Sequence, residues 1–117
     1  MQIRKYDIVL VNLDPAVGAE KKGVRPCVVV QNNQANRFSE TTVVCPLSTT
    51  LKHYPNNLII NPSSQNQLKQ ISCLDILQIK TVDKSRIRKK WGMLDERYHD
   101  ELSAKFFVSF DLEDLLY

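Results

Sequence analysis

Short apolar runs rich in β-branched residues, separated by proline, glycine and polar residues, fill most of the chain. Runs of this length are typical of β-strands, and the longest, Ile8–Val11, is far shorter than the ~20 residues that cross a bilayer. Because proline cannot donate to a β-ladder, Pro26 is expected at the beginning of its strand. The pattern predicts a polar loop at 31–39 and strands at 6–12, 27–30, 41–47, 57–61, 71–81 (bent near its middle) and 86–94.

The spacing of apolar residues changes near the end of the chain. From Leu94 to Phe110 an apolar residue recurs every four positions, which places one stripe along a helix. Asp95 is placed to cap the N-terminus of this helix, which we expect at 96–112. Short strands followed by one packed helix predict an α+β, mainly β fold of the barrel-plus-helix kind. A length of 117 residues fits one domain, 1–117.

Charge and cysteine content narrow the class of protein. Lys and Arg exceed Asp and Glu by 16 to 13, and the resulting charge of +3 is compatible with a polyanionic partner without requiring one. Cys27, Cys45 and Cys73 lie in apolar runs without CxxC spacing, so we expect buried free thiols in a reducing cytosol. No acidic or histidine cluster has metal-ligand spacing, and no signal peptide is recognisable. The sequence therefore predicts a cytoplasmic protein without a metal or another cofactor.

The segment 13–23 is longer than a hairpin needs, since two residues suffice to join neighbouring antiparallel strands. A connection of about ten residues is either functional or mobile. This one contains Glu20 and two lysines, and Arg25 and Pro26 follow it directly. Taken one by one, these residues fit a solvated hairpin loop. Their order and spacing carry more information.

The segments Asp14–Glu20 (DPAVGAE) and Gly23–Pro26 (GVRP) resemble the N-terminal motif of the MazF/PemK toxins. The resemblance continues through 31–39, the pair Ser48-Thr49 and 78–86, and so covers nearly the whole chain. It implies an SH3-like β-barrel with a long C-terminal helix, which forms a homodimer and cleaves single-stranded RNA at short sequence motifs without a metal. It also implies a cognate antitoxin with an acidic, disordered tail.

Cleavage of RNA through its own 2′-hydroxyl needs a base, an acid for the leaving 5′-oxygen and donors for the phosphate. The resemblance makes Arg25 and Ser48 the catalytic residues, because they match the arginine and the threonine of the family. A guanidinium suits two phosphate oxygens, whereas proton transfer by Arg25 would need its pKa lowered by at least ~5 units. We therefore expect phosphate stabilisation first. Serine lacks the methyl group of threonine, so Thr49 could share the role.

The resemblance adds three substrate-binding candidates to Thr49. Glu20 matches a loop glutamate that acts as a base, holds Arg25 or only completes the loop, and the sequence leaves these roles open. Gln78 and Lys80 lie two residues apart on one predicted strand, so they share a face and are candidate RNA contacts.

Other features carry weaker signals. Leu77 stands where the family often has an acidic residue, and Asp75, two residues earlier on the same predicted face, could compensate in part. His53 is either a proton-transfer group or a solvated loop residue, and His99 is expected on the surface. The basic run 86–91, which ends in a tryptophan, either binds phosphates and a base or protects an edge strand. We favour the edge strand, although both explanations fit equally well.

Together these features favour a sequence-selective, metal-independent endoribonuclease, the toxin of a toxin–antitoxin pair, that leaves a 2′,3′-cyclic phosphate and a 5′-hydroxyl. Two alternatives stay open. A gyrase-poisoning toxin of the same fold is disfavoured, because those toxins end in a tryptophan-containing tail and Trp91 here is internal. A non-catalytic RNA-binding barrel stays an alternative because Ser48 and Leu77 depart from the family pattern.

Overall fold

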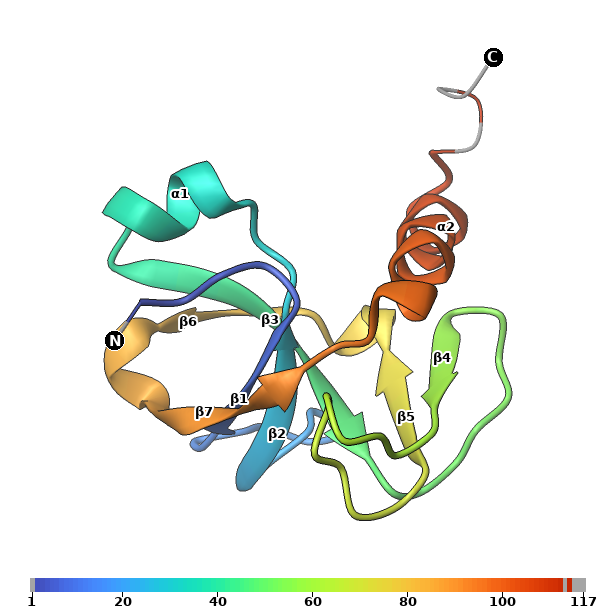
Figure 1. Ribbon diagram of the computed structural model, residues 1–117, viewed down its shortest axis with the longest axis horizontal. Coiled ribbons are helices and arrows are strands. Elements are labelled where there is room, and N and C mark those ends of the chain that lie inside the picture. The colour runs from blue at the N-terminus through green and yellow to red at the C-terminus, as the bar shows by residue number, and fades with distance from the viewer. Residues whose placement is uncertain (1, 113, 115–117) are drawn as a thin grey trace.

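Antiparallel strands form a curved sheet in the computed structural model, which describes residues 2–112 and 114 (Figure 1). The strands are β1 (Asp7–Asn12), β2 (Val24–Val29), β3 (Thr41–Ser48), β4 (Asn57–Ile60), β5 (Ser72–Asp75), β6 (Lys80–Asp83) and β7 (Ile87–Met93). The helices are α1 (Asn33–Phe38), α2 (His99–Ser109) and the short 3₁₀ helices η1 (Ile76–Gln78), η2 (Lys84–Arg86) and η3 (Glu96–Tyr98). No helix within the described residues has the length and apolar character needed to cross a membrane.

β3 is the centre of the sheet because it pairs with three neighbours. The strand order is β4-β5-β3-β2-β1-β7, and β6 pairs with the first half of β3. Figure 1 shows β6 and β7 running from η2 along opposite walls of the barrel. No ladder joins these two strands within residues 2–112, so the barrel is open there. The predicted mainly β fold with a C-terminal helix is confirmed.

Alternation along the strands divides the core into two apolar clusters, one on each side of the sheet. Ile8 and Val28 belong to the cluster that α2 covers through Leu102. Val9 and Cys27, the neighbours of these residues in sequence, belong to the second cluster, on the side that β1, β2, β3 and β6 enclose. The second cluster reaches the segment 13–23, and the polar residues of interest lie at that end of the sheet.

The segment 31–39 was expected to be a polar loop, but it contains α1, so that prediction is wrong. Asn32 caps this short helix, because its side-chain oxygen accepts a hydrogen bond from Ala35 N at 2.8 Å. Asn36 is buried, and its Oδ1 accepts hydrogen bonds from Gln31 Nε2 and Thr42 Oγ1 while its Nδ2 donates to Gln31 O. Polar contacts with the rest of the protein therefore stabilise a helix that has no apolar stripe to reveal it in the sequence.

The C-terminal helix is shorter than predicted. Its first turn is the 3₁₀ helix η3, and α2 ends at Ser109 rather than at 112. Asp95 holds the N-cap position of η3, as predicted, but its side chain makes no capping hydrogen bond. The carboxylate of Asp95 instead accepts a hydrogen bond from Asn66 Nδ2 at 2.8 Å. The side-chain amide of Asn66 thus binds the carboxylate that was expected to cap the helix.

Two details of the strands bear on the prediction. The bend expected within 71–81 is confirmed, because η1 separates β5 from β6. Pro26 lies inside β2 rather than at its beginning, opposite Leu10 of β1. The ladder from β2 to β3 begins one residue later, at Cys27, so the missing N–H of proline interrupts no bond to β3.

All three cysteines are buried free thiols, in agreement with the sequence. Burial raises the pKa of both Cys27 and Cys45 from 9.0 to about 12. The unfolded chain therefore loses these protons near pH 9, whereas the folded protein keeps them. The stability that the two buried thiols contribute is fully present below their pKa in the unfolded chain. Stability should then fall by about 1.4 kcal/mol per pH unit for each thiol as the pH rises toward the folded value.

Urea unfolding at a pH below 9.0, and again midway between that value and about 12, measures this loss. The variant Cys45→Ala should be less stable at both pH values, because it leaves a cavity, but should lose less stability between them. A pH dependence identical to that of the parent protein would mean that thiol titration is not its cause.

Candidate functional site

The ends of β2 and β3 bring Arg25 and Ser48 onto one face of the sheet. The ladder pairs Cys27 with Pro46, and the same register continued by two residues places Arg25 opposite Ser48. Residues that face each other across antiparallel strands share a side of the sheet. Both side chains therefore lie on the side of the second apolar cluster, where the β2–β3 ladder stops.

Hydrogen bonds fasten the loop 13–23 over this end of the sheet. A backbone bond of 2.9 Å closes the loop at its base, and the Glu20 carboxylate accepts from Val17 N at 2.8 Å. Lys21 N donates to the side-chain oxygen of Gln78 at 3.1 Å, which ties the loop to η1. The two glycines of the loop have positive φ, a conformation that few other residues adopt readily. Hydrogen bonds and glycine conformations therefore give the loop a defined structure.

Two adjoining cavities lie beneath the loop and share Ala19, Lys21 and Gln78. The larger, here called the loop cavity, has a volume of about 380 Å³ and is also lined by Glu20 and Lys80. The smaller, here called the strand cavity, has a volume of about 180 Å³ and reaches β3, β4 and β5. Its further lining residues are Ser48, Thr50, Lys52, Asn57, Cys73 and Asp75.

The predicted site residues take different places around these cavities. Ser48 lines the strand cavity, and its Oγ accepts from the backbone N–H two residues further on, at 3.1 Å. Glu20, Gln78 and Lys80 all line the loop cavity. Thr49 is exposed and is absent from the described lining of both cavities. The structure thus brings four of these side chains together and leaves Thr49 outside.

Arg25 is not in the described lining of either cavity. It is half-buried, and its Nε donates to Lys22 O at 2.8 Å, which holds the side chain against the loop. This contact uses one of the five N–H groups of a guanidinium and leaves those of the two terminal nitrogens for other acceptors. The loop therefore holds Arg25, which the continued register places opposite Ser48. The two terminal nitrogens of the guanidinium, which suit two phosphate oxygens, take no part in this contact.

The expected pairing of Asp75 with Leu77 on one face is wrong. The 3₁₀ helix η1 interrupts the alternation, so Leu77 is exposed and lines the loop cavity, whereas Asp75 lines the strand cavity. Asp75 Oδ1 accepts from Leu77 N at 2.9 Å and so caps η1. The same interruption removes the strand argument for Gln78 and Lys80, although both do line one cavity. Asp75 is therefore no substitute for an acidic residue at position 77.

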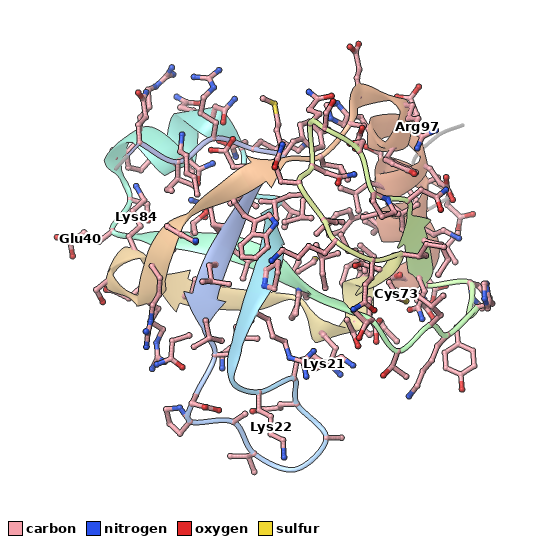
Figure 2. All side chains as sticks on the ribbon, turned by 60° about the horizontal axis from the view of Figure 1, so that its bottom comes forward. Lys21, Lys22, Glu40, Cys73, Lys84 and Arg97 are labelled. Carbon is pink, nitrogen blue, oxygen red and sulfur yellow. The ribbon has the colours of Figure 1, made fainter. Side chains whose placement is uncertain are left out.

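Three residues of the strand cavity were missed by sequence reasoning. Lys21 was noted only as a loop charge, and Figure 2 shows it nearer than Lys22 to Cys73 of β5. Lys52 lies in the segment between β3 and β4, and Asn57 begins β4. The charges of the loop were a signal for Lys21. No sequence signal marked Asn57, because a polar residue at the start of a strand is ordinary.

The remaining sequence features lie outside the two cavities. His53 is exposed and absent from the described lining of both. His99 is half-buried, stacks on Tyr6 with ring centroids 3.5 Å apart and reaches a backbone oxygen, so its predicted surface position is wrong. Except for Arg86, which ends η2, the basic run falls on β7, at the end of the strand order, where Lys89 lies over the Trp91 ring. These facts agree with a charged edge strand.

Cationic side chains predominate around the cleft. The two linings contain the lysines Lys21, Lys52 and Lys80 and the acids Asp75 and Glu20. Among the described residues, His, Cys, Asp and Glu side chains nowhere gather in threes that could hold a metal ion. The fold and the site together define a small, open antiparallel barrel with a hydroxyl and several cations beneath a long loop, an arrangement suited to a polyanionic chain.

Comparison with known proteins identifies the class more closely. Residues 4–110 match the family described as PemK-like, MazF-like toxin of type II toxin-antitoxin system. The chain belongs to this family. Endoribonuclease EndoA of Bacillus subtilis is 31% identical over 116 residues, which cover 97% of this chain and 99% of that protein. Endoribonuclease MazF of Staphylococcus saprophyticus is 29% identical over 115 residues, covering 97% and 95%.

Solved structures agree on the fold. MazF of Deinococcus radiodurans (Form-I) has a TM-score of 0.81 and 19% identity, over 95% of this chain and 98% of that one. A mycobacterial endoribonuclease in complex with its cognate antitoxin has a TM-score of 0.79 and 18% identity, over 94% and 96%. At this identity the likeness extends to the fold, and the roles of individual residues rest on the site itself.

Proposed function

We propose that this toxin is an endoribonuclease that cuts single-stranded RNA at short sequence motifs without a metal ion, and that residues 1–117 form one cytoplasmic domain. The observation that carries the proposal is the placement of Arg25 and Ser48 at one end of neighbouring strands, beside a cationic cleft. The names of the Bacillus and Staphylococcus relatives, both endoribonucleases, support the activity.

The reaction needs groups that this cleft supplies. The 2′-hydroxyl of the RNA loses its proton to a base as its oxygen attacks phosphorus. The bond to the 5′-oxygen breaks and this oxygen takes up a proton from an acid, so the products carry a 2′,3′-cyclic phosphate and a 5′-hydroxyl. Arg25 and Ser48 donate hydrogen bonds to the non-bridging oxygens, where charge builds up in the transition state. Because Ser48 Oγ already accepts a backbone N–H, its own proton is the one it donates. Lys21, Lys52 and Lys80 attract the flanking phosphates and bases, and Gln78 contributes a contact in the loop cavity.

Two variants of Glu20 distinguish a structural role in the loop from a role in proton transfer. Its carboxylate accepts from Val17 N, and a glutamine keeps that acceptor but cannot serve as a base. We expect Glu20→Gln to retain most of kcat and Glu20→Ala to lower it roughly tenfold, the worth of one hydrogen bond. Single-turnover cleavage of one RNA by both variants measures this. Equal, large losses in the two variants would instead make Glu20 the base.

We also propose an antitoxin partner and a homodimer. The mycobacterial relative is described in complex with its cognate antitoxin, which supports a partner of the same kind here. An acidic antitoxin tail would be attracted by the lysines of the loop 13–23, and by occupying or distorting this loop it would keep RNA from Ser48. The homodimer follows from the family resemblance, and it would use the same surface patch on both subunits.

One experiment tests the proposed activity against its alternatives. The purified protein is incubated in EDTA with a long unstructured RNA, and the 5′ ends of the products are labelled directly with polynucleotide kinase, which requires a 5′-hydroxyl. We expect discrete fragments that label without prior phosphatase treatment, and loss of these fragments with Ser48→Ala. RNA binding without cleavage would favour the non-catalytic barrel. Arrest of DNA supercoiling without any effect on RNA would favour the gyrase poison.

A further inference from the structure

The strand cavity contains a buried hydrogen-bond acceptor that lacks a partner. Asn57 is only 6% exposed and lines the cavity. Its Nδ2 donates to Lys52 O at 2.7 Å, and this contact fixes the orientation of the amide. Its Oδ1 has no hydrogen-bond partner within the described residues. Because nearly all buried polar atoms in folded proteins are paired, this oxygen indicates a donor supplied from outside the chain.

Asp75 provides a second acceptor on the same side. The β4–β5 ladder pairs Asn57 with Asp75, and the β3–β5 ladder pairs Ser48 with Cys73, two residues before Asp75. These side chains therefore share one face of the sheet. Asp75 Oδ1 already accepts from the backbone of η1, which leaves Oδ2 to accept from a ligand. Asn57, Asp75 and Ser48 thus all belong to the lining of the strand cavity, and the first two each have a side-chain oxygen left to accept from a ligand.

We propose that the strand cavity reads one base of the RNA and selects cytosine over uracil through the oxygens of Asn57 and Asp75. This inference rests on the proposed nuclease function and concerns a base next to the phosphate at Ser48. Cytosine has a 4-amino group with two N–H donors, one for each oxygen, and carboxylates are the side chains that read this group. Its N3 and O2 are acceptors, which suit the ammonium groups of Lys21 and Lys52 on the same lining.

Uracil fits less well than cytosine. It has nearly the same shape, but its O4 takes the place of the amino group and would face two acceptors without a proton between them. Of these two one-ring bases, only cytosine carries an amino group.

The variant Asp75→Asn tests the reading of the base with little change to the fold. Asparagine caps a helical turn as well as aspartate does, so η1 keeps its hydrogen bond while the second oxygen becomes an NH₂ donor. Asp83 caps η2 through the Ser85 N–H in the same way, also at 2.9 Å, and lies outside both cavities. Asp83→Asn is therefore the matched control, and Asn57→Leu is a second variant that removes the orphaned acceptor.

Cleavage ends are mapped on one transcript and then measured on pairs of short RNAs that differ by C or U at a single position. At one position next to the cut, the parent protein and Asp83→Asn should favour C by roughly 10- to 100-fold in kcat/KM. Asp75→Asn should abolish this preference or turn it toward U, because an NH₂ group donates to O4 of uracil, and Asn57→Leu should weaken it. Cleavage with unchanged base preference in both variants would overturn the inference while leaving the proposed function intact.

A binding measurement keeps the inference testable if the protein cuts no RNA, in which case the proposed function fails. Short 2′-O-methyl RNAs, which cannot be cleaved through a 2′-hydroxyl, are labelled and titrated with the parent protein, Asp75→Asn and Asp83→Asn. Tighter binding of the C-containing RNA by the parent and the control, but not by Asp75→Asn, supports the subsite. Equal affinity of the parent for the C and U versions overturns it.

Discussion

Replacing Arg25 with alanine should lower kcat for RNA cleavage by at least about 100-fold and change KM much less. The Nε of Arg25 donates to Lys22 O, which leaves the terminal N–H groups of the guanidinium to donate to the phosphate in the proposed reaction. Hydrogen bonds of this kind are strongest when negative charge builds up on the phosphate oxygens, which happens in the transition state rather than in the bound substrate. Single-turnover kinetics over a range of protein concentrations separates kcat from KM.

Two further variants make the Arg25 result specific. Arg25→Lys keeps the charge but not the planar fork, so its kcat should lie between those of the parent and the alanine variant. Arg37→Ala removes an arginine from the last turn of α1, outside both cavities, and should leave kcat unchanged. Since Arg25 also anchors the loop, RNA affinity and thermal unfolding are measured for each variant. An alanine variant with full activity would exclude Arg25 from catalysis.

The sequence was sufficient for the parts of the fold that depend on apolar spacing. Each predicted strand has a counterpart, because alternation of buried and exposed residues is a local signal that survives folding. The loop 13–23 and the pair Arg25 and Ser48 could also be found, the first from its length and the second from the family motif. That these two side chains face each other needed the β2–β3 register, which no local pattern contains.

The missed features depend on contacts between distant segments. The helix α1 is held by the cap of Asn32 and the buried amide of Asn36, not by an apolar stripe. The 3₁₀ helix η1 breaks the strand at the point where Asp75 captures a backbone N–H, so the faces inferred from alternation were wrong beyond that point. Asn57 became visible as a site residue only when its oxygen was found buried without a partner. In all three cases the deciding feature was a hydrogen bond that a polar side chain makes or lacks.

Asn66→Ala should be the most destabilising polar substitution in the protein, because the side chain of Asn66 is fully buried and makes four hydrogen bonds. Its Oδ1 accepts from the backbone N–H groups of Ser63 and Leu68, at 3.0 and 2.9 Å. Its Nδ2 donates to Asn61 O at 2.9 Å and to the Asp95 carboxylate at 2.8 Å. Alanine leaves these partners without a bond, and each such buried group costs about 1–3 kcal/mol.

The expected loss is about 3–5 kcal/mol, a large share of the roughly 5–15 kcal/mol that stabilises a typical protein. The backbone of this segment packs closely on β7, because Asn66 O lies 2.5 Å from where a Cβ on Gly92 would be. Urea unfolding measures the loss, and Asn32→Ala, which removes an exposed cap, should cost only about 1 kcal/mol. If Asn66→Ala cost no more than Asn32→Ala, water would be satisfying the vacated groups, and the large loss expected for Asn66 would be wrong.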